Sequence, residues 1–202
     1  MAPILGVILA GGLSRRMGGG DKPLRILAGR TLLHRVVERF TPQCGLGVIL
    51  NANGDPARFA GFPGPIVPDG VPDHPGPLAG ILAALDHAAA QHPSATHVAS
   101  VTGDAPFLPH DLVERLAAEG DGAPIAMASS AGREHFAVAL WALSLRGDLR
   151  TTLVERGERR VGAFLARHGA AAVDWPAKPV DPFLNINTPE DLAMAEAFLE
   201  TS

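Results

Sequence analysis

The chain has 202 residues, of which 47% are hydrophobic, and it carries a formal net charge of −4 at pH 7. This length is sufficient for one α/β unit with a buried core and short for two, so we expect a single domain over residues 1–202. The net charge, the absence of a dense Lys/Arg tract and the absence of a run of roughly 18 apolar residues argue against nucleic acid or a membrane as partner.

Short apolar runs alternate along the chain with longer segments of helical period. This alternation is typical of parallel strands joined by helices. Several of the runs are apolar throughout, as strands covered on both faces must be. We expect strands at 4–10, 45–51, 64–69, 96–104, 123–129 and 135–141.

Helical segments are predicted from Thr31, from Gly76 and from His110. A last helix is indicated by "NTPEDLAMAEAFLE", where Thr188 can cap the helix and Pro189 suits its first turn. The sequence therefore predicts a three-layer α/β/α sandwich, a Rossmann-like fold with a mostly parallel sheet. Ligands of such sheets bind beyond the carboxyl ends of the strands, which directs attention to the loops after Ala10, Asn51, Asp69 and Asp104.

The first of these loops lies in "LAGGLSRRMGGGDK", residues 9–22. Gly11 and Gly12 allow a tight turn whose amides can face anionic oxygens, and Arg15, Arg16 and Lys22 add positive charge around it. Taken alone, these residues could equally form a flexible turn with solvated cations. The loop matches neither the P-loop pattern G-x-x-x-x-G-K-[ST] nor the dinucleotide pattern G-x-G-x-x-G.

Six motifs in order resemble one known family. They are "LAGG-x-S-x-R-M-G-x-x-DK", "VILNAN", "VPDG…DHPGPLAGI", "TGDAPFLP", "GERRV" and "NINTPEDL". In order and spacing these motifs are similar to those of the molybdenum cofactor guanylyltransferases (MobA) of the nucleotidyltransferase superfamily. The resemblance covers essentially the whole chain. The resemblance implies transfer of GMP from GTP to the terminal phosphate of Mo-molybdopterin, with pyrophosphate as the second product.

The resemblance also implies roles for individual residues. Asp104 follows an apolar strand and is expected to bind Mg²⁺, although it could instead cap the next helix. Asn187 is expected to reach the same metal, or to shape the turn before the last helix. Lys22 is assigned to the α-phosphate and Arg16 to the β- and γ-phosphates, where charge stabilisation supplies most of the catalysis.

The nucleotide-binding residues are expected at the ends of the first strands. Main-chain groups of the first loop and the side chains of Asn51 and Asp69 can bind guanine or ribose, or can be ordinary turn residues. The full expected set is Leu9, Ala10, Gly11, Gly12, Lys22, Asn51, Asp69 and Asp104. The N-terminal half would then bind GTP and the C-terminal half the acceptor.

On the acceptor side, "GREHFAVALW" and "RGERRVGAFLARHG" are similar to the family's acceptor half. His135 could line that pocket, and Arg159 and Arg160 could bind the molybdopterin phosphate or remain solvated. The chain has Phe136 where the family more often has proline after the histidine.

Rival functions remain open at the level of sequence. A molybdopterin cytidylyltransferase or a nucleotidyltransferase for a sugar or small phosphate would use the same fold. The resemblance implies GTP rather than CTP, because the cytidylyl enzymes tend to have alanine at the place of Gly11. A noncatalytic nucleotide-binding protein is a further alternative, against which Lys22 and Asp104 argue. The single Cys44 fits a cytoplasmic protein. Molybdenum-insertion proteins and molybdoenzyme chaperones are expected partners by resemblance alone.

Overall fold

In the part of the chain that the computed structural model describes, residues 3–11, 21–71 and 76–200, seven strands form one sheet in the order β5-β4-β1-β6-β8-β7-β9. The strands follow the sequence patterns closely, with β5 reduced to two residues. Their bounds are β1 Ile4–Leu9, β4 Val48–Asn51, β5 Ile66–Val67, β6 His97–Thr102, β7 Ile125–Ser130, β8 Arg133–Ala142 and β9 Ala170–Trp175.

Most neighbouring strands run parallel, which confirms the predicted sheet type. β1 pairs in parallel with β4 and β6, β4 with β5, and β7 with β9, whereas β8 pairs antiparallel with both β6 and β7. The strand patterns alone do not predict β9 or the reversed direction of β8. Because β8 is the one reversed strand, the carboxyl ends of the other six meet at one edge of the sheet.

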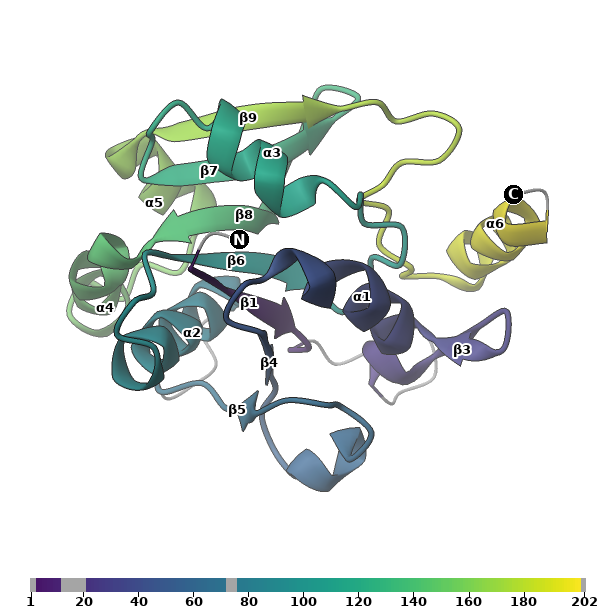
Figure 1. The fold of residues 1–202 in the computed structure, drawn as a ribbon, viewed down its shortest axis with the longest axis horizontal. Coiled ribbons are helices and arrows are strands. Elements are labelled where there is room, and N and C mark those ends of the chain that lie inside the picture. Colours follow the sequence, from purple (N-terminus) through teal and green to yellow (C-terminus); the bar gives the residue numbers. More distant parts are fainter. Residues whose placement is uncertain (1–2, 12–20, 72–75, 201–202) are drawn as a thin grey trace.

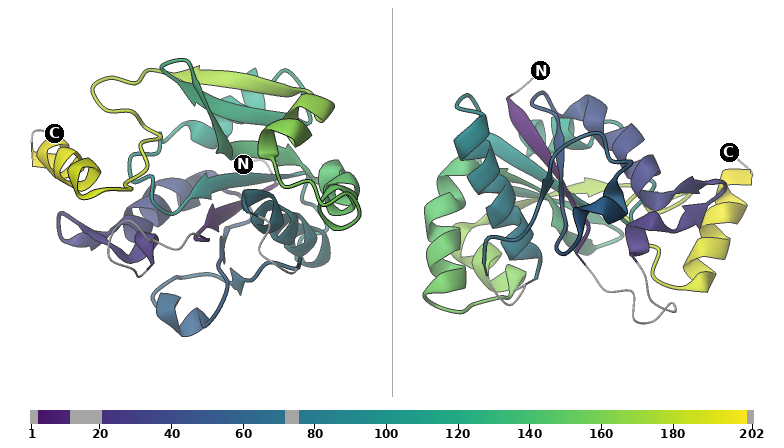
Figure 2. Two further views of the ribbon diagram at one scale, coloured as in Figure 1. Left: turned by 180° about the vertical axis from the view of Figure 1, so that it is seen from behind. Right: turned by 90° about the horizontal axis from the view of Figure 1, so that it is seen from below.

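Helices cover both faces of the sheet and make the three layers visible in Figure 1 and, from below, in Figure 2. α1 (Leu32–Phe40) and α3 (Leu112–Glu119) pack on one face, while α2 (Pro77–Gln91), α4 (Arg146–Val154) and α5 (Val161–His168) pack on the other. The three-layer α/β/α architecture is therefore confirmed. α4 and α5 are not among the helices predicted from the sequence patterns.

β1 lies at the centre of both cores because its side chains alternate between the two faces. Ile4 and Ile8 contact the α1 and α3 layer, whereas Leu5 and Val7 contact the layer that contains α2. Each such fully buried side chain contributes about 1.5–3 kcal/mol of hydrophobic stabilisation. At Gly6 an added Cβ would lie 2.8 Å from Phe40 of α1, so this glycine is what lets α1 pack directly on the strand.

The predicted helix starts are largely confirmed. The hydroxyl of Thr31 accepts a hydrogen bond of 3.0 Å from the His34 amide at the start of α1, and Pro77 is the first residue of α2. α3 begins at Leu112 rather than at His110. In its first turn the Val113 amide donates to Gln43 Oε1 at 3.0 Å, and among the described residues no hydrogen bond joins this turn to the Asp104 carboxylate, so Asp104 does not cap the helix.

The chain ends in α6 (Pro189–Glu200), which stands apart from the sheet layers (Figure 1). α6 packs on the hairpin of β2 (Ile26–Leu27) and β3 (Arg30–Thr31), and a small third core joins them. Asp191 donates its amide to the Thr188 hydroxyl at 3.1 Å, so the predicted cap is confirmed. The segment before α6 is thereby fixed beside the edge of the sheet.

Candidate functional site

A cavity of about 670 Å³ opens at the carboxyl edge of β1, β4 and β6. It lies where open α/β sheets bind their ligands. The structure brings most of the sequence-predicted nucleotide and metal residues to its wall. Those lining residues are Leu9, Ala10, Gly11, Lys22, Asn51, Asp69, Asp104 and Asn187.

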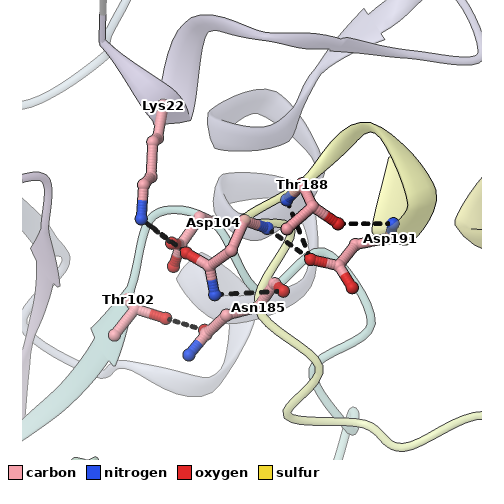
Figure 3. Close-up of polar contacts among 7 residues, drawn as sticks. Lys22, Thr102, Asp104, Asn185, Thr188 and Asp191 are labelled. Atoms are coloured by element: carbon pink, nitrogen blue, oxygen red, sulfur yellow. Dashed lines mark hydrogen bonds and ion pairs between the residues drawn. The ribbon is translucent and has the colours of Figure 1, made fainter. Parts of the chain in front are cut away.

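Lys22, Asp104 and Asn187 all line this cavity, and Figure 3 shows the Lys22 side chain directed toward Asp104. The Lys22 ammonium donates to Asn187 Oδ1 at 2.5 Å and lies 3.9 Å from Asp104 Oδ2. Its three donors can serve both oxygens at once. The two side chains predicted to bind a metal therefore face a common cation, and that cation is the predicted catalytic lysine.

Hydrogen bonds to main-chain groups hold Asp104 and Asn187 in place. The Ile186 amide donates to the Asp104 carbonyl at 3.0 Å, which ties the segment before α6 to the loop after β6. The Asp191 carboxylate accepts from the Asn187 and Thr188 amides at 2.9 Å each (Figure 3). These bonds satisfy the free amides at the start of α6, so Asn187 is positioned by the helix cap itself.

The environment of Asp104 suits a bound cation. Burial raises the pKa of its carboxyl above the ordinary value, while the Thr102 hydroxyl and the Lys22 charge act in the opposite direction. A buried carboxylate of this kind is stabilised by a positive charge placed beside it. Within residues 3–11, 21–71 and 76–200, no cluster of three His, Cys, Asp or Glu side chains could hold a metal ion. A hard cation here would take oxygens from Asp104 and Asn187 and its remaining ligands from phosphate and water.

Asn51, Asn53 and Asp69 form a polar network on the opposite wall. Asn51 Nδ2 donates to Asp69 Oδ1 at 2.9 Å and to the Val67 carbonyl at 3.1 Å. Asn53 Nδ2 donates to Asp69 Oδ2 at 2.7 Å, and the Asp69 amide donates back to Asn53 Oδ1 at 2.8 Å. The network joins the ends of β4 and β5 and fixes the Asp69 carboxylate at the cavity. Asn53 lies within the motif "VILNAN", but its own role is not predicted from the sequence.

Gly80 of α2 lets the helix approach this network closely. A Cβ at this position would overlap Asn51 Oδ1 and would lie 2.8 Å from Leu9 Cδ2. At Gly11, by contrast, no described atom lies within 4 Å of an added Cβ, and the residue lines the cavity. The fold therefore requires glycine at position 80, whereas at position 11 a methyl group would meet none of the described residues within 4 Å.

Arg58 is a cavity residue that the sequence patterns miss. Its guanidinium donates to Asp21 Oδ1 at 2.5 Å, to the Asn53 carbonyl, and through Nε to the Asp55 carbonyl at 3.0 Å. Asp21 directly precedes η2 (Lys22–Leu24), the short 3₁₀ turn that carries the lysine. Arg58 thus links the wall with Asn53 to the wall with Lys22. No local signal in the sequence indicates this pairing, because Arg58 and Asp21 are 37 positions apart.

A second cavity of about 600 Å³ adjoins the first and shares Pro77, Thr102, Ala137 and Asn185 with it. His135 lines this second cavity, beside Phe183. Arg159 and Arg160 line neither cavity, and the Arg160 side chain is 82% exposed in an ion pair with Glu158. Their contact with the acceptor phosphate therefore stays a prediction. Gly12, Arg15 and Arg16 lie outside the described residues.

The fold and the cavity together define a class of protein. A mostly parallel sheet in three layers, with a lysine, a buried carboxylate and an amide–carboxylate network around one cavity at its carboxyl edge, is the arrangement of a nucleotidyltransferase. The chain belongs to the family of the MobA-like NTP transferase domain, whose model matches residues 6–172.

Named relatives agree with this membership. A molybdenum cofactor guanylyltransferase of Rhodopseudomonas palustris (strain BisB5) is 56% identical over 192 residues, which are 94% of this chain and 91% of the relative. One of Bradyrhizobium sp. (strain ORS 278) is 54% identical over 193 residues, 95% and 91% of the two chains. The crystal structure of molybdopterin-guanine dinucleotide biosynthesis protein A from Archaeoglobus fulgidus superposes with a TM-score of 0.75 at 25% identity and covers 98% of this chain and 100% of its own.

Proposed function

We propose that the protein transfers GMP from GTP to the terminal phosphate of Mo-molybdopterin and releases pyrophosphate. The observation that carries the proposal is the convergence of Lys22, Asp104 and Asn187 at the cavity, in a chain that is 56% identical to a molybdenum cofactor guanylyltransferase. Relatives of that name support GTP over the cytidylyl and sugar alternatives. Helices long and apolar enough to cross a bilayer are absent from the described residues.

The polar network supports guanine or ribose binding on one wall. Guanine presents N–H donors on its Watson–Crick edge, and the ribose presents hydroxyl donors, so each needs acceptors on the protein. The Asp69 carboxylate, held by Asn51 and Asn53, supplies such acceptors at a fixed position. Main-chain groups of Leu9, Ala10 and Gly11 would complete this subsite, because β1 ends at the same cavity.

The opposite wall is suited to the triphosphate. Lys22 is placed to neutralise charge that develops on the α-phosphate during transfer. Asp104 and Asn187 offer the two oxygens for Mg²⁺, which when bound would neutralise phosphate charge and orient the leaving pyrophosphate. Since the Lys22 ammonium contacts the Asn187 oxygen and lies beside the Asp104 carboxylate, it would turn from them to the α-phosphate when GTP enters. We also assign Arg16 to the β- and γ-phosphates, on the resemblance alone.

The chemical step requires positioning more than proton transfer. An oxygen of the acceptor phosphate forms a bond to the α-phosphorus of GTP, and the bond from that phosphorus to the bridging β-phosphate oxygen breaks. The attacking oxygen is already anionic, so no general base is needed. The second cavity, which is continuous with the first through Thr102 and Asn185, would hold the acceptor. The N-terminal half would thus bind GTP and the C-terminal half Mo-molybdopterin within one domain.

The experiment that tests this function follows pyrophosphate release and dinucleotide formation with purified protein, Mg²⁺ and Mo-molybdopterin, with GTP and CTP in parallel. We expect turnover with GTP and a lower kcat/KM with CTP. Lys22→Ala should lose mainly kcat, whereas Lys178→Ala, at an exposed lysine outside both cavities, is the matched control. A higher kcat/KM with CTP would overturn the base assignment. A loss confined to KM in Lys22→Ala would limit that residue to ground-state binding.

The cytoplasmic location and the association with molybdenum-insertion proteins or molybdoenzyme chaperones remain part of this proposal. They rest on the biosynthetic names of the relatives and on the single buried Cys44. Burial raises the pKa of this thiol to about 12, so Cys44 is unreactive at neutral pH.

A further inference from the structure

A chain of hydrogen bonds joins three separate segments at the second cavity. Ser130, the last residue of β7, is fully buried, and its hydroxyl lies 2.8 Å from His135 Nε2 near the start of β8. The same hydroxyl lies 2.9 Å from Asp181 Oδ1, in the segment between β9 and α6. The Phe183 amide also donates to Asp181 Oδ1 at 2.9 Å. His135 and Phe183 both line the cavity, and their ring centroids are 4.8 Å apart.

The donors and acceptors in this series of hydrogen bonds determine the tautomer of His135. A serine hydroxyl has one proton to donate, and an ionised carboxylate can only accept. The Ser130 proton is therefore directed to Asp181, which leaves the Ser130 oxygen as an acceptor toward the histidine. His135 must then carry its proton on Nε2, and Nδ1 is left with a lone pair.

The surroundings favour the neutral ring. Burial lowers the pKa of His135 below its ordinary value, and Arg133 lowers it further, while Asp181 raises it. A neutral imidazole with hydrogen on Nε2 presents Nδ1 purely as a hydrogen-bond acceptor. The cavity around it is bordered by the aromatic side chains of Phe136 and Phe183, which suit the faces of a flat heterocycle.

We propose that Ser130 and Asp181 are positioning residues that hold His135 in the Nε2–H tautomer, so that Nδ1 accepts a hydrogen bond from an N–H group of the acceptor's heterocycle. This inference rests on the proposed function and extends it to recognition of the acceptor ring. A site that pairs with a donor on its substrate discriminates strongly against analogues without that donor, because the protein atom is then left unpaired. His135 thereby determines which acceptor binds, whereas the first cavity determines which nucleotide binds.

Ser130→Ala and His135→Phe test the consequence for catalysis. Each variant should raise KM for Mo-molybdopterin about tenfold, the change expected for one lost hydrogen bond, and should leave KM for GTP within about twofold of the wild type. Asp181→Asn should also raise KM for Mo-molybdopterin, because an amide can donate to Ser130 and so reverse the direction of the hydrogen bonds.

The neighbouring residue of β7 provides matched controls. Ser129 is also buried, and its hydroxyl donates to the Asp174 carboxylate at 2.9 Å, but unlike the Ser130 bond this one does not involve His135. Ser129→Ala therefore removes a serine–carboxylate bond of the same length from the adjacent position of β7, and Asp174→Asn replaces its carboxylate with an amide. They should leave both KM values unchanged. Equal effects of Ser129→Ala and Ser130→Ala on KM for Mo-molybdopterin would mean that Ser130 acts on stability alone, and would overturn the proposal.

A measurement of the tautomer separates this inference from the proposed function, because it requires no turnover. In protein labelled with ¹⁵N-histidine, the His135 signals can be assigned by their loss in His135→Phe. At neutral pH the long-range ¹H–¹⁵N spectrum should show a protonated Nε2 and an unprotonated Nδ1, and Ser130→Ala should shift this pattern toward a mixture of tautomers. A protonated Nδ1 in the wild type would overturn the proposal even in an active enzyme. The predicted tautomer in an enzyme that does not transfer GMP would refute only the proposed function.

Discussion

The position of the Lys22 ammonium beside both Asp104 and Asn187 predicts that lysine and metal compete for the same oxygens. The ammonium lies 2.5 Å from Asn187 Oδ1 and 3.9 Å from Asp104 Oδ2, which are the atoms proposed to bind Mg²⁺. A divalent cation that enters without nucleotide must displace the lysine or bind beside a like charge. Neutralising Lys22 should therefore tighten metal binding to the empty protein.

The magnitude follows from the ion pair. Two unit charges at this distance attract by about 4 kcal/mol at an effective dielectric constant of about 20. Desolvation and ordering of the side chains offset most of this, and pairs near a surface contribute a net of about 1 kcal/mol or less. We therefore expect Mn²⁺ to bind Lys22→Met about fivefold more tightly than the wild type, the ratio that corresponds to about 1 kcal/mol. Turnover should fall in the same variant.

The assay is a titration of nucleotide-free protein with Mn²⁺, in which free Mn²⁺ is read from its electron paramagnetic resonance signal. Lys22→Arg keeps the positive charge and should bind Mn²⁺ as weakly as the wild type. Asp104→Asn should weaken binding in either background, because it removes the carboxylate. Unchanged or weaker Mn²⁺ binding in Lys22→Met would refute the idea that the ammonium occupies the metal position.

Three further predictions concern the fold and the site. Gly80→Ala should destabilise the protein by about 1–3 kcal/mol in urea unfolding and weaken GTP binding, because the methyl group would displace Asn51. Gly147→Ala in α4, where an added Cβ meets no described atom within 4 Å, should change neither stability nor GTP binding. Equal effects of the two substitutions would refute this packing argument. Asp104→Asn should lower kcat at least about a hundredfold, because it removes the proposed metal ligand, and near-normal turnover would place the metal elsewhere. The same substitution should raise Tm at neutral pH, because burial raises the pKa of this carboxyl and so makes its ionised form unfavourable in the folded protein. The His168 hydrogen bond lowers the pKa of Asp148, so this pair should stabilise the protein above the ordinary pKa of aspartate and lose that effect as pH falls through the lowered value. In thermal melts from pH 7 to pH 3, Tm should therefore fall less in Asp148→Asn than in the wild type. Parallel plots of Tm against pH for the two proteins would contradict this prediction.

Much of the fold and the centre of the site can be read from local sequence. β1 is an apolar run and β6 is largely apolar, and the residues that follow them, including Gly11 and Asp104, must meet at one edge once the strands lie parallel. The place of Asn187 is also encoded locally, because Thr188 and Pro189 mark where α6 begins. In these cases the signal lies within a few residues of the feature.

The parts that the sequence does not predict depend on contacts between distant segments. β9 contains "AAAVDW", whose alanines favour a helix, but pairing with β7 overrides this preference. The arrangement of Arg58 with Asp21 joins positions 37 apart, and that of Ser130 with Asp181 joins positions 51 apart. No local period marks either pair, so both are visible only when the chain is folded.

The proposed reaction forms a bond to the α-phosphorus of GTP while pyrophosphate leaves, and the fate of labelled phosphorus distinguishes it from other reactions of GTP. Wild-type protein with Mg²⁺ and Mo-molybdopterin would be given GTP labelled at the α-phosphate or, separately, at the γ-phosphate. We expect the α-label to be recovered in a guanine dinucleotide cofactor and the γ-label in pyrophosphate. Recovery of the γ-label in the cofactor, or of the γ-label as free orthophosphate with no labelled dinucleotide, would contradict it.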